Sequence, residues 1–150
     1  EIETKDTGIS EIYSTSEQEV FNEVINENQI KKIPHNFLSE ITQPILFKSI
    51  GNKDISLSTQ HHLDNVANIL KEYPSYHVLI VGHTCDIRST EKNDEVGRER
   101  AKNVAKYLED KGITPDRIVI ESKGESQPRF SNNTDENRVK NRRVEITVVE

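Results

Sequence analysis

Several residue types that are common in proteins are rare or missing in this chain of 150 residues. It contains no methionine and no tryptophan, a single cysteine, and only 5% aromatic residues. The lone Cys85 excludes a disulfide within the chain and leaves the cellular compartment open. No run of about eighteen apolar residues occurs, so the sequence predicts no membrane-spanning helix.

An excess of basic charge is also missing. The chain has 26 Asp and Glu against 20 Lys and Arg, which gives a formal net charge of −6. General nucleic-acid binding uses a basic surface and stacking rings, so we expect no nucleic-acid partner. Because the chain begins at Glu1 and has no methionine, we expect a processed or excised piece, with any membrane contact made through parts outside it.

Residues 1–43 differ in character from the rest of the chain. The first part is rich in Glu, Ser and Thr, and its apolar residues are scattered. A short helix over 16–28 is predicted, with Ser16 as its cap and Glu19 three residues later as a capping-box partner. We interpret 1–43 as a linker or N-terminal extension with this helix, and 44–150 as the folded domain.

Regular periodicities begin at Pro44. Apolar residues at three- and four-residue spacing, such as Leu63 and Leu70, predict a helix that Ser58 caps and Pro74 ends. A second helix ends at Gly112, a natural left-handed terminator. The predicted elements are strands over 45–47, 76–81, 117–121 and 143–148, and helices over 58–73 and 97–111.

The order of these elements predicts an α/β (α+β) fold in two layers. Strands that alternate with helices pair in parallel through helical crossovers, and the helices pack on the sheet. The last strand follows a long polar connection, so we expect it to be antiparallel or at an edge. The prediction is a βαβαβ(α)β order with a mixed four-stranded sheet.

Three groups of residues, in chain order, carry a resemblance to a known family. They are Gly82-His83-Thr84 with Asn93 and Arg100-Ala101; Gly112-Ile113 with Arg117-Ile118, Gly124-Glu125, Pro128 and Asn132; and Asn141-Arg142-Arg143-Val144-Glu145. With these groups, residues 44–150 resemble the OmpA-like C-terminal domain found in flagellar stator proteins and peptidoglycan-associated lipoproteins. The resemblance implies an α/β sandwich that binds the diaminopimelate residue of the cell-wall stem peptide.

The resemblance also implies roles for particular side chains. The free end of diaminopimelate carries an ammonium and a carboxylate on one carbon. Arg100 would bind the carboxylate through its planar fork, close to a helix start if Gly97 is the cap. Thr84 and Asn93 would be neutral partners, and Val96 would line the pocket wall.

The sequence departs from the family pattern where the ammonium would bind. The aspartate that normally follows the threonine is replaced by Cys85, and Arg88 stands where a glycine is usual. Two interpretations stay open: the adjacent Asp86 replaces the missing carboxylate, or diaminopimelate recognition has been lost. Arg143, together with Arg142, would line the pocket or contact glycan, or would pair with nearby acids as exposed arginines commonly do.

Catalytic and metal sites are weaker interpretations of the same residues. His83 and Cys85 lie two apart, but no third orienting group or oxyanion hole appears at a recognisable spacing. The adjacent His61 and His62 would point about 100° apart on a helix and make a poor chelate. We therefore expect no catalytic residue, no metal and no cofactor.

The function implied by the resemblance is non-covalent binding of peptidoglycan, which anchors an envelope protein to the wall. The alternative is an interaction or scaffold domain that kept the fold but lost diaminopimelate binding. In either case we expect a non-enzymatic module in the periplasm, associated with the outer membrane of a Gram-negative cell. The sequence leaves open whether the domain forms a homodimer.

Overall fold

The computed structural model describes residues 31–150. The chain divides into two compact units, 1–32 and 33–150, and the second contains all of the elements below. The helix predicted over 16–28 lies outside the described residues. In chain order, the elements are α3 (His35–Ile41), β1 (Ile45–Leu46), α4 (Leu57–Glu72), β2 (His77–His83), α5 (Thr90–Asp110), η1 (Pro115–Arg117), β3 (Ile118–Gly124), α6 (Asp135–Asn141) and β4 (Arg143–Val149).

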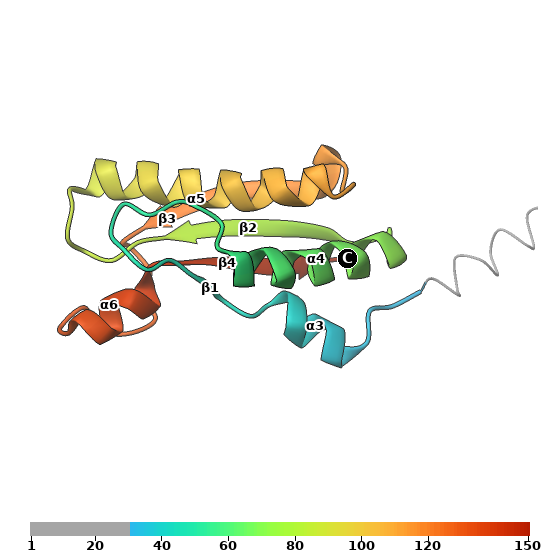
Figure 1. Ribbon diagram of the computed structural model, residues 1–150, viewed down its shortest axis with the longest axis horizontal. Helices are drawn as coiled ribbons and strands as arrows, with labels where there is room; N and C mark the ends of the chain where they lie inside the picture. The colour runs from blue at the N-terminus through green and yellow to red at the C-terminus, as the bar shows by residue number, and fades with distance from the viewer. Residues whose placement is uncertain (1–30) are drawn as a thin grey trace, which may run out of the picture. The chain divides into compact units, whose positions relative to one another are not determined.

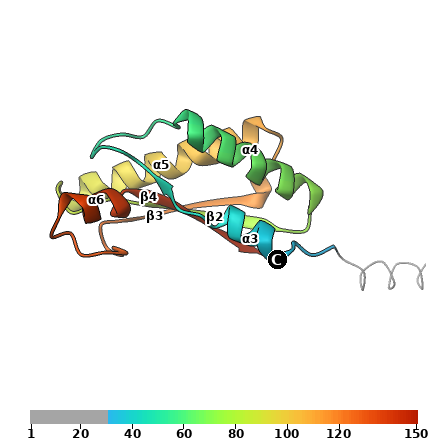
Figure 2. The same cartoon turned by 60° about the horizontal axis from the view of Figure 1, so that its bottom comes forward.

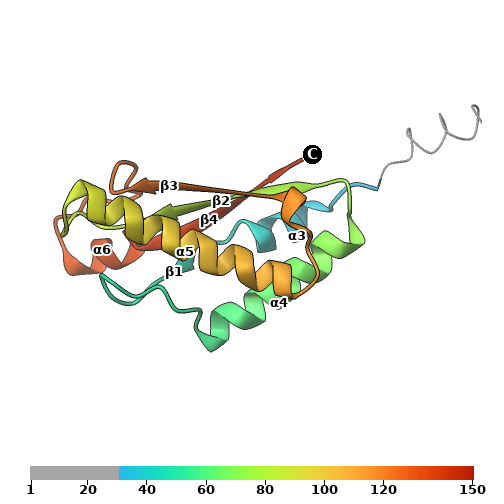
Figure 3. The ribbon, with the colours of Figure 1, turned by 90° about the horizontal axis from the view of Figure 1, so that it is seen from above.

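The predicted α/β class with a mixed four-stranded sheet is confirmed. The strand order is β1-β4-β2-β3. Strands β2 and β3 are parallel, and β4 is antiparallel to both β1 and β2. Helix α5 lies along β2 and β3 with α4 beside it, as Figure 1 and Figure 3 show.

The position of β4 decides between the two alternatives that the sequence left open. The strand is antiparallel, as expected, but it lies inside the sheet between β1 and β2. Its alternation arises because Val144 and Ile146 are buried in the core while Glu145 and Thr147 are more exposed. The alternation therefore indicates that one face of the sheet is covered, as expected for a strand buried on one side.

Helix α5 begins earlier than predicted. It starts at Thr90, and the Ser89 hydroxyl caps it by accepting from the Lys92 N–H at 3.2 Å. The first two turns were not predicted because, of their buried residues Asn93, Val96 and Gly97, only Val96 is clearly apolar, and one residue does not form an apolar stripe. At its other end, Gly112 follows the helix with φ 106°, as expected of a left-handed terminator.

The hydrophobic core also takes in residues that precede position 44. Ile33 is 5% exposed and Ile41, at the end of α3, is fully buried. Both belong to the same cluster as Leu63, Ile80 and Ile146. Residues 33–43 are thus part of the compact unit, whereas the predicted folded domain began at residue 44.

Close approach of α5 to the sheet depends on two glycines. A Cβ at Gly82 on β2 would lie 1.7 Å from the carbonyl oxygen of Gly97, and a Cβ at Gly97 would lie 2.5 Å from Ser122 Oγ. At Gly82 the overlap is with the helix backbone, so no side chain fits there without moving the helix away from β2. This contact sets the start of α5 directly against the ends of β2 and β3.

One end of the unit therefore gathers several chain segments. The ends of β2 and β3, the start of α5, the 125–134 loop and α6 lie together at the end opposite the chain's C-terminus, as Figure 1 and Figure 2 show. This end contains most of the residues that carry the family resemblance.

Candidate functional site

The predicted site residues do come together at this end of the unit, but nearly all of them are buried. Thr84 is 3% exposed, Cys85 1%, Asn93 2%, Val96 3%, Arg100 0% and Arg143 3%. Only the seventh, Asp86, is exposed, with 43% of its side chain accessible. In this conformation Asp86 is the predicted residue that a ligand can touch.

Arg100 is enclosed by backbone carbonyl groups. Its Nε donates to Asn52 O at 2.7 Å, its Nη1 to His83 O at 3.1 Å, and its Nη2 to Ser49 O at 2.9 Å and Ile50 O at 3.0 Å. These bonds use four of the five N–H donors of a guanidinium. The residue lies in the middle of α5, since the helix starts at Thr90, so the expected help from the helix start is absent.

Arg142 holds the other side of the same segment. Its Nε donates to Phe47 O at 3.1 Å and its Nη2 to Lys48 O at 2.7 Å, while Nη1 lies 3.8 Å from Cys85 Sγ. Burial, and next the charge of Arg142, lowers the pKa of Arg100 to about 10. We call residues 47–52 the clamped loop, because two guanidiniums fix its carbonyl groups.

Two buried asparagines order the loops around the site. Asn93 Nδ2 donates to Arg88 O at 3.0 Å and to Glu125 Oε1 at 2.9 Å, joining the loop after β2 to the loop after β3. Asn141, fully buried at the end of α6, bonds both the N–H and the carbonyl of Phe130 and also Asn132 Oδ1. Both amides are therefore structural groups beneath the surface.

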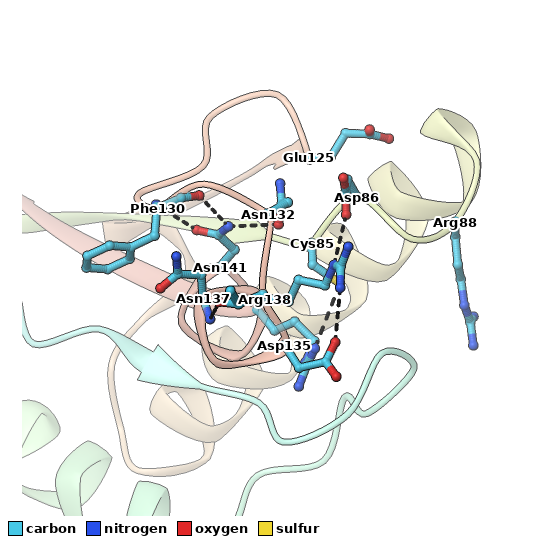
Figure 4. Close-up of polar contacts among 12 residues, drawn as sticks. Cys85, Asp86, Arg88, Glu125, Phe130, Asn132, Asp135, Asn137, Arg138 and Asn141 are labelled. Atoms are coloured by element: carbon cyan, nitrogen blue, oxygen red, sulfur yellow. Dashed lines mark hydrogen bonds and ion pairs between the residues drawn. The ribbon is translucent and has the colours of Figure 1, made fainter.

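An ion pair of opposite charges lies on the surface above them. Arg138 Nε is 3.4 Å from Asp86 Oδ1, and Arg138 Nη1 is 3.0 Å from Asp135 Oδ1. Figure 4 shows the Arg138 side chain from α6 between these two carboxylates, with Asn132 and Asn137 nearby. Arg138 keeps 27% of its side chain exposed and Asp135 96%.

Arg143 is used inside the protein, as the ion-pair interpretation predicted for it. It binds the Glu145 carboxylate through Nε, and its Nη2 donates to Gln127 O at 3.0 Å. Arg142, in contrast, pairs with carbonyl groups and not with an acid. Neither guanidinium is presented to solvent.

The buried His83 lies next to this pair. Its Nε2 is 4.0 Å from Glu145 Oε1, and among the described residues its Nδ1 has no hydrogen-bond partner. Burial, and next the charge of Arg143, lowers the pKa of His83 to about 4. His83 is therefore a neutral imidazole at physiological pH.

Two features of the site were not predicted from the sequence. The clamped loop contributes carbonyl oxygens, which any residue provides, so no side-chain pattern marks it. The second feature is Arg138, which lies in a charged run before Asn141 and was given no role from the sequence. Its i to i+3 spacing from Asp135 was visible, but the contact with Asp86 crosses 52 positions and needs the fold.

The described residues contain no group of three or more His, Cys, Asp or Glu arranged to hold a metal ion. In the same part of the chain, none of the helices combines the length and apolar character needed to cross a membrane.

Comparison with known proteins shows similarity over the region that builds this site. Residues 47–142 match the OmpA family. "Outer membrane protein A" of Bordetella avium is 41% identical over 87 residues, which are 58% of this chain and 45% of that protein. "Peptidoglycan-binding protein ArfA" of Mycobacterium tuberculosis is 41% identical over 107 residues, 70% of this chain and 32% of that protein. The chain thus spans less than half the length of these relatives.

Solved structures show the same fold. The C-terminal domain of Helicobacter pylori MotB superposes with a TM-score of 0.68 at 28% identity, over 72% of this chain and 84% of that one. The peptidoglycan-associated lipoprotein of Burkholderia pseudomallei has a TM-score of 0.69 over 71% of this chain and 90% of that one. At 24% identity, this second likeness concerns the fold alone.

Proposed function

This chain belongs to the OmpA family, and we propose that it binds peptidoglycan non-covalently and so tethers an envelope protein to the cell wall. One relative is named a peptidoglycan-binding protein, and others are named outer membrane proteins. These names support a periplasmic position associated with the outer membrane, and a binding role without catalysis.

We further propose that the ligand is the diaminopimelate end of the stem peptide and that Asp86 binds its ammonium. The observation that carries this is the exposure of Asp86, directly after the cysteine that replaces the family's aspartate. The buried Thr84, Asn93 and Val96 then support the loop that presents Asp86.

The test is calorimetric titration with a stem tripeptide that has meso-diaminopimelate as its third residue. Asp86→Asn keeps the shape and removes the charge, so affinity should fall about ten- to a hundred-fold, the value of one charge-assisted hydrogen bond. Asp110→Asn is the matched control, because Asp110 is an exposed carboxylate paired with Lys106 near the far end of α5. Equal binding by Asp86→Asn and wild type would remove Asp86 from the site.

The second candidate is a scaffold domain that has lost diaminopimelate binding. It is favoured by Cys85 at the aspartate position and by the enclosure of Arg100 in carbonyl groups. Co-sedimentation with isolated peptidoglycan separates the two functions: a scaffold stays in the supernatant at low salt. Release of soluble muropeptides in the same experiment would instead indicate an enzyme.

A further inference from the structure

The carboxylate of a bound zwitterion needs a cation that reaches the surface. Arg100 is fully buried and donates to four carbonyl groups. Arg142 is 7% exposed and holds Phe47 O and Lys48 O. Using either one would expose the carbonyl groups that it satisfies, and buried acceptors left without donors are costly.

Arg138 meets the requirement that these two arginines do not. Its guanidinium lies 3.4 Å from Asp86, the exposed carboxylate of the site, and is itself partly exposed. Among the described residues, Arg138 donates through Nε to Asp86 and through Nη1 to Asp135, while its Nη2 donates to no acceptor. A planar fork of this kind binds a carboxylate with two parallel hydrogen bonds.

Buried hydrogen bonds hold the end of the helix that carries Arg138. Asn141, three residues later on the same helix, is fully buried and bonded to Phe130 and Asn132. Arg142 then ties the helix end to the clamped loop. The position of Arg138 relative to the loops around it is thus set by buried contacts.

We propose that Asp86 and Arg138 together form the receptor for an α-amino-acid zwitterion, with the ammonium on Asp86 and the carboxylate on Arg138. This inference rests on the proposed function and identifies the cation of that site. Arg100 is assigned to holding the clamped loop. Opposite charges on one ligand carbon match opposite charges held side by side on the protein.

Asp135 has a distinct part in this arrangement. It occupies Arg138 Nη1 at 3.0 Å, yet its side chain is 96% exposed. An ion pair this exposed is weak, so a ligand carboxylate can displace it. Asp135 is therefore a competitor for the position that the ligand carboxylate takes.

The experiment uses the full 150-residue chain and two stem tripeptides. One has meso-diaminopimelate as its third residue. The other has L-lysine, which offers the ammonium without the carboxylate. Calorimetric titration compares wild type with Arg138→Gln, Asp135→Asn and a control, Arg98→Gln, which removes an exposed arginine paired with Asp94.

Three results are expected. Arg138→Gln weakens binding of the diaminopimelate peptide about ten- to a hundred-fold and leaves binding of the lysine peptide unchanged, so the preference between them disappears. Asp135→Asn tightens binding of the diaminopimelate peptide, a gain that misfolding cannot produce. Arg98→Gln binds as wild type does.

The contrary results are separable. If wild type prefers the diaminopimelate peptide and Arg138→Gln keeps that preference, the inference is wrong and the proposed function stands. If wild type sediments with peptidoglycan but binds neither peptide, the zwitterion site is wrong and wall binding stands. If wild type neither sediments nor binds, the proposed function fails and the inference with it.

Discussion

At the scale of single residues, the most informative side chain is Arg100, whose guanidinium donates its hydrogen bonds to backbone carbonyl groups. The Arg100 side chain is fully buried. Its ring contact is Phe47, 4.9 Å from the guanidinium carbon. The side chain that the family resemblance assigns to the ligand donates here to backbone carbonyl groups of the clamped loop.

Replacing Arg100 should therefore destabilise the folded domain. In Arg100→Met, the carbonyl groups of the clamped loop lose a charged donor, and we expect a loss of at least about 3 kcal/mol in the free energy of unfolding. Arg98→Met, at an exposed position of the same helix, should stay within about 0.5 kcal/mol of wild type. Urea denaturation measures both, and equal stability of the two variants would contradict the enclosure of Arg100.

His83 predicts a pH dependence of stability. Its pKa is lowered from 6.5 to about 4 by burial and next by the charge of Arg143, with Glu145, Lys123 and Glu121 also facing it. The unfolded state then binds more protons between these values, so stability rises with pH from about 4 to 6.5 and is flat above. The full change is roughly 3 kcal/mol.

The measurement is the free energy of unfolding as a function of pH for wild type and His83→Gln. The acidic residues are the same in both proteins, so the difference between the two slopes isolates the contribution of the His83 imidazole. A slope in His83→Gln as steep as that of wild type would show that His83 is not buried as a neutral group.

At the scale of elements, the packing of α5 on β2 positions the whole site. Gly97→Ala places a methyl group 2.5 Å from Ser122 Oγ. The better helix propensity of alanine, about 1 kcal/mol, should be outweighed by this overlap, for a net loss of about 1–3 kcal/mol. Because the start of α5 shifts, the loop that carries Asp86 should also move.

Gly51→Ala is the matched control for that substitution. The three atoms nearest to the new methyl group would all belong to the flexible end of the Arg88 side chain, the first of them 3.1 Å away. Thermal unfolding should show a lower midpoint for Gly97→Ala and little change for Gly51→Ala. A raised midpoint for Gly97→Ala would mean that helix and sheet are farther apart than described.

At the scale of the whole molecule, the sequence predicted the layers better than the site. Periodicity identified α4 and the strands, because their buried positions hold apolar residues such as Leu63 and Ile80. It failed at the start of α5, where Val96 is the only large apolar residue among the buried Asn93, Val96 and Gly97. The same polar burial applies to the candidate site. The predicted residues lie at one end of the unit, but the sequence did not show that all of them except Asp86 are buried.

The position of β1 has a consequence for how the chain folds. β1 pairs only with β4, through Ile45 opposite Val144 and Leu46 opposite Arg143. Among the described strands, the first in chain order thus has the last in chain order as its sole neighbour, and the clamped loop likewise needs Arg142 to bind its carbonyl groups. Pairings this distant in sequence close large loops late and slow the search for the native state. Until residues 142–149 have left the ribosome, β1 lacks its partner strand and β2 lacks its antiparallel neighbour.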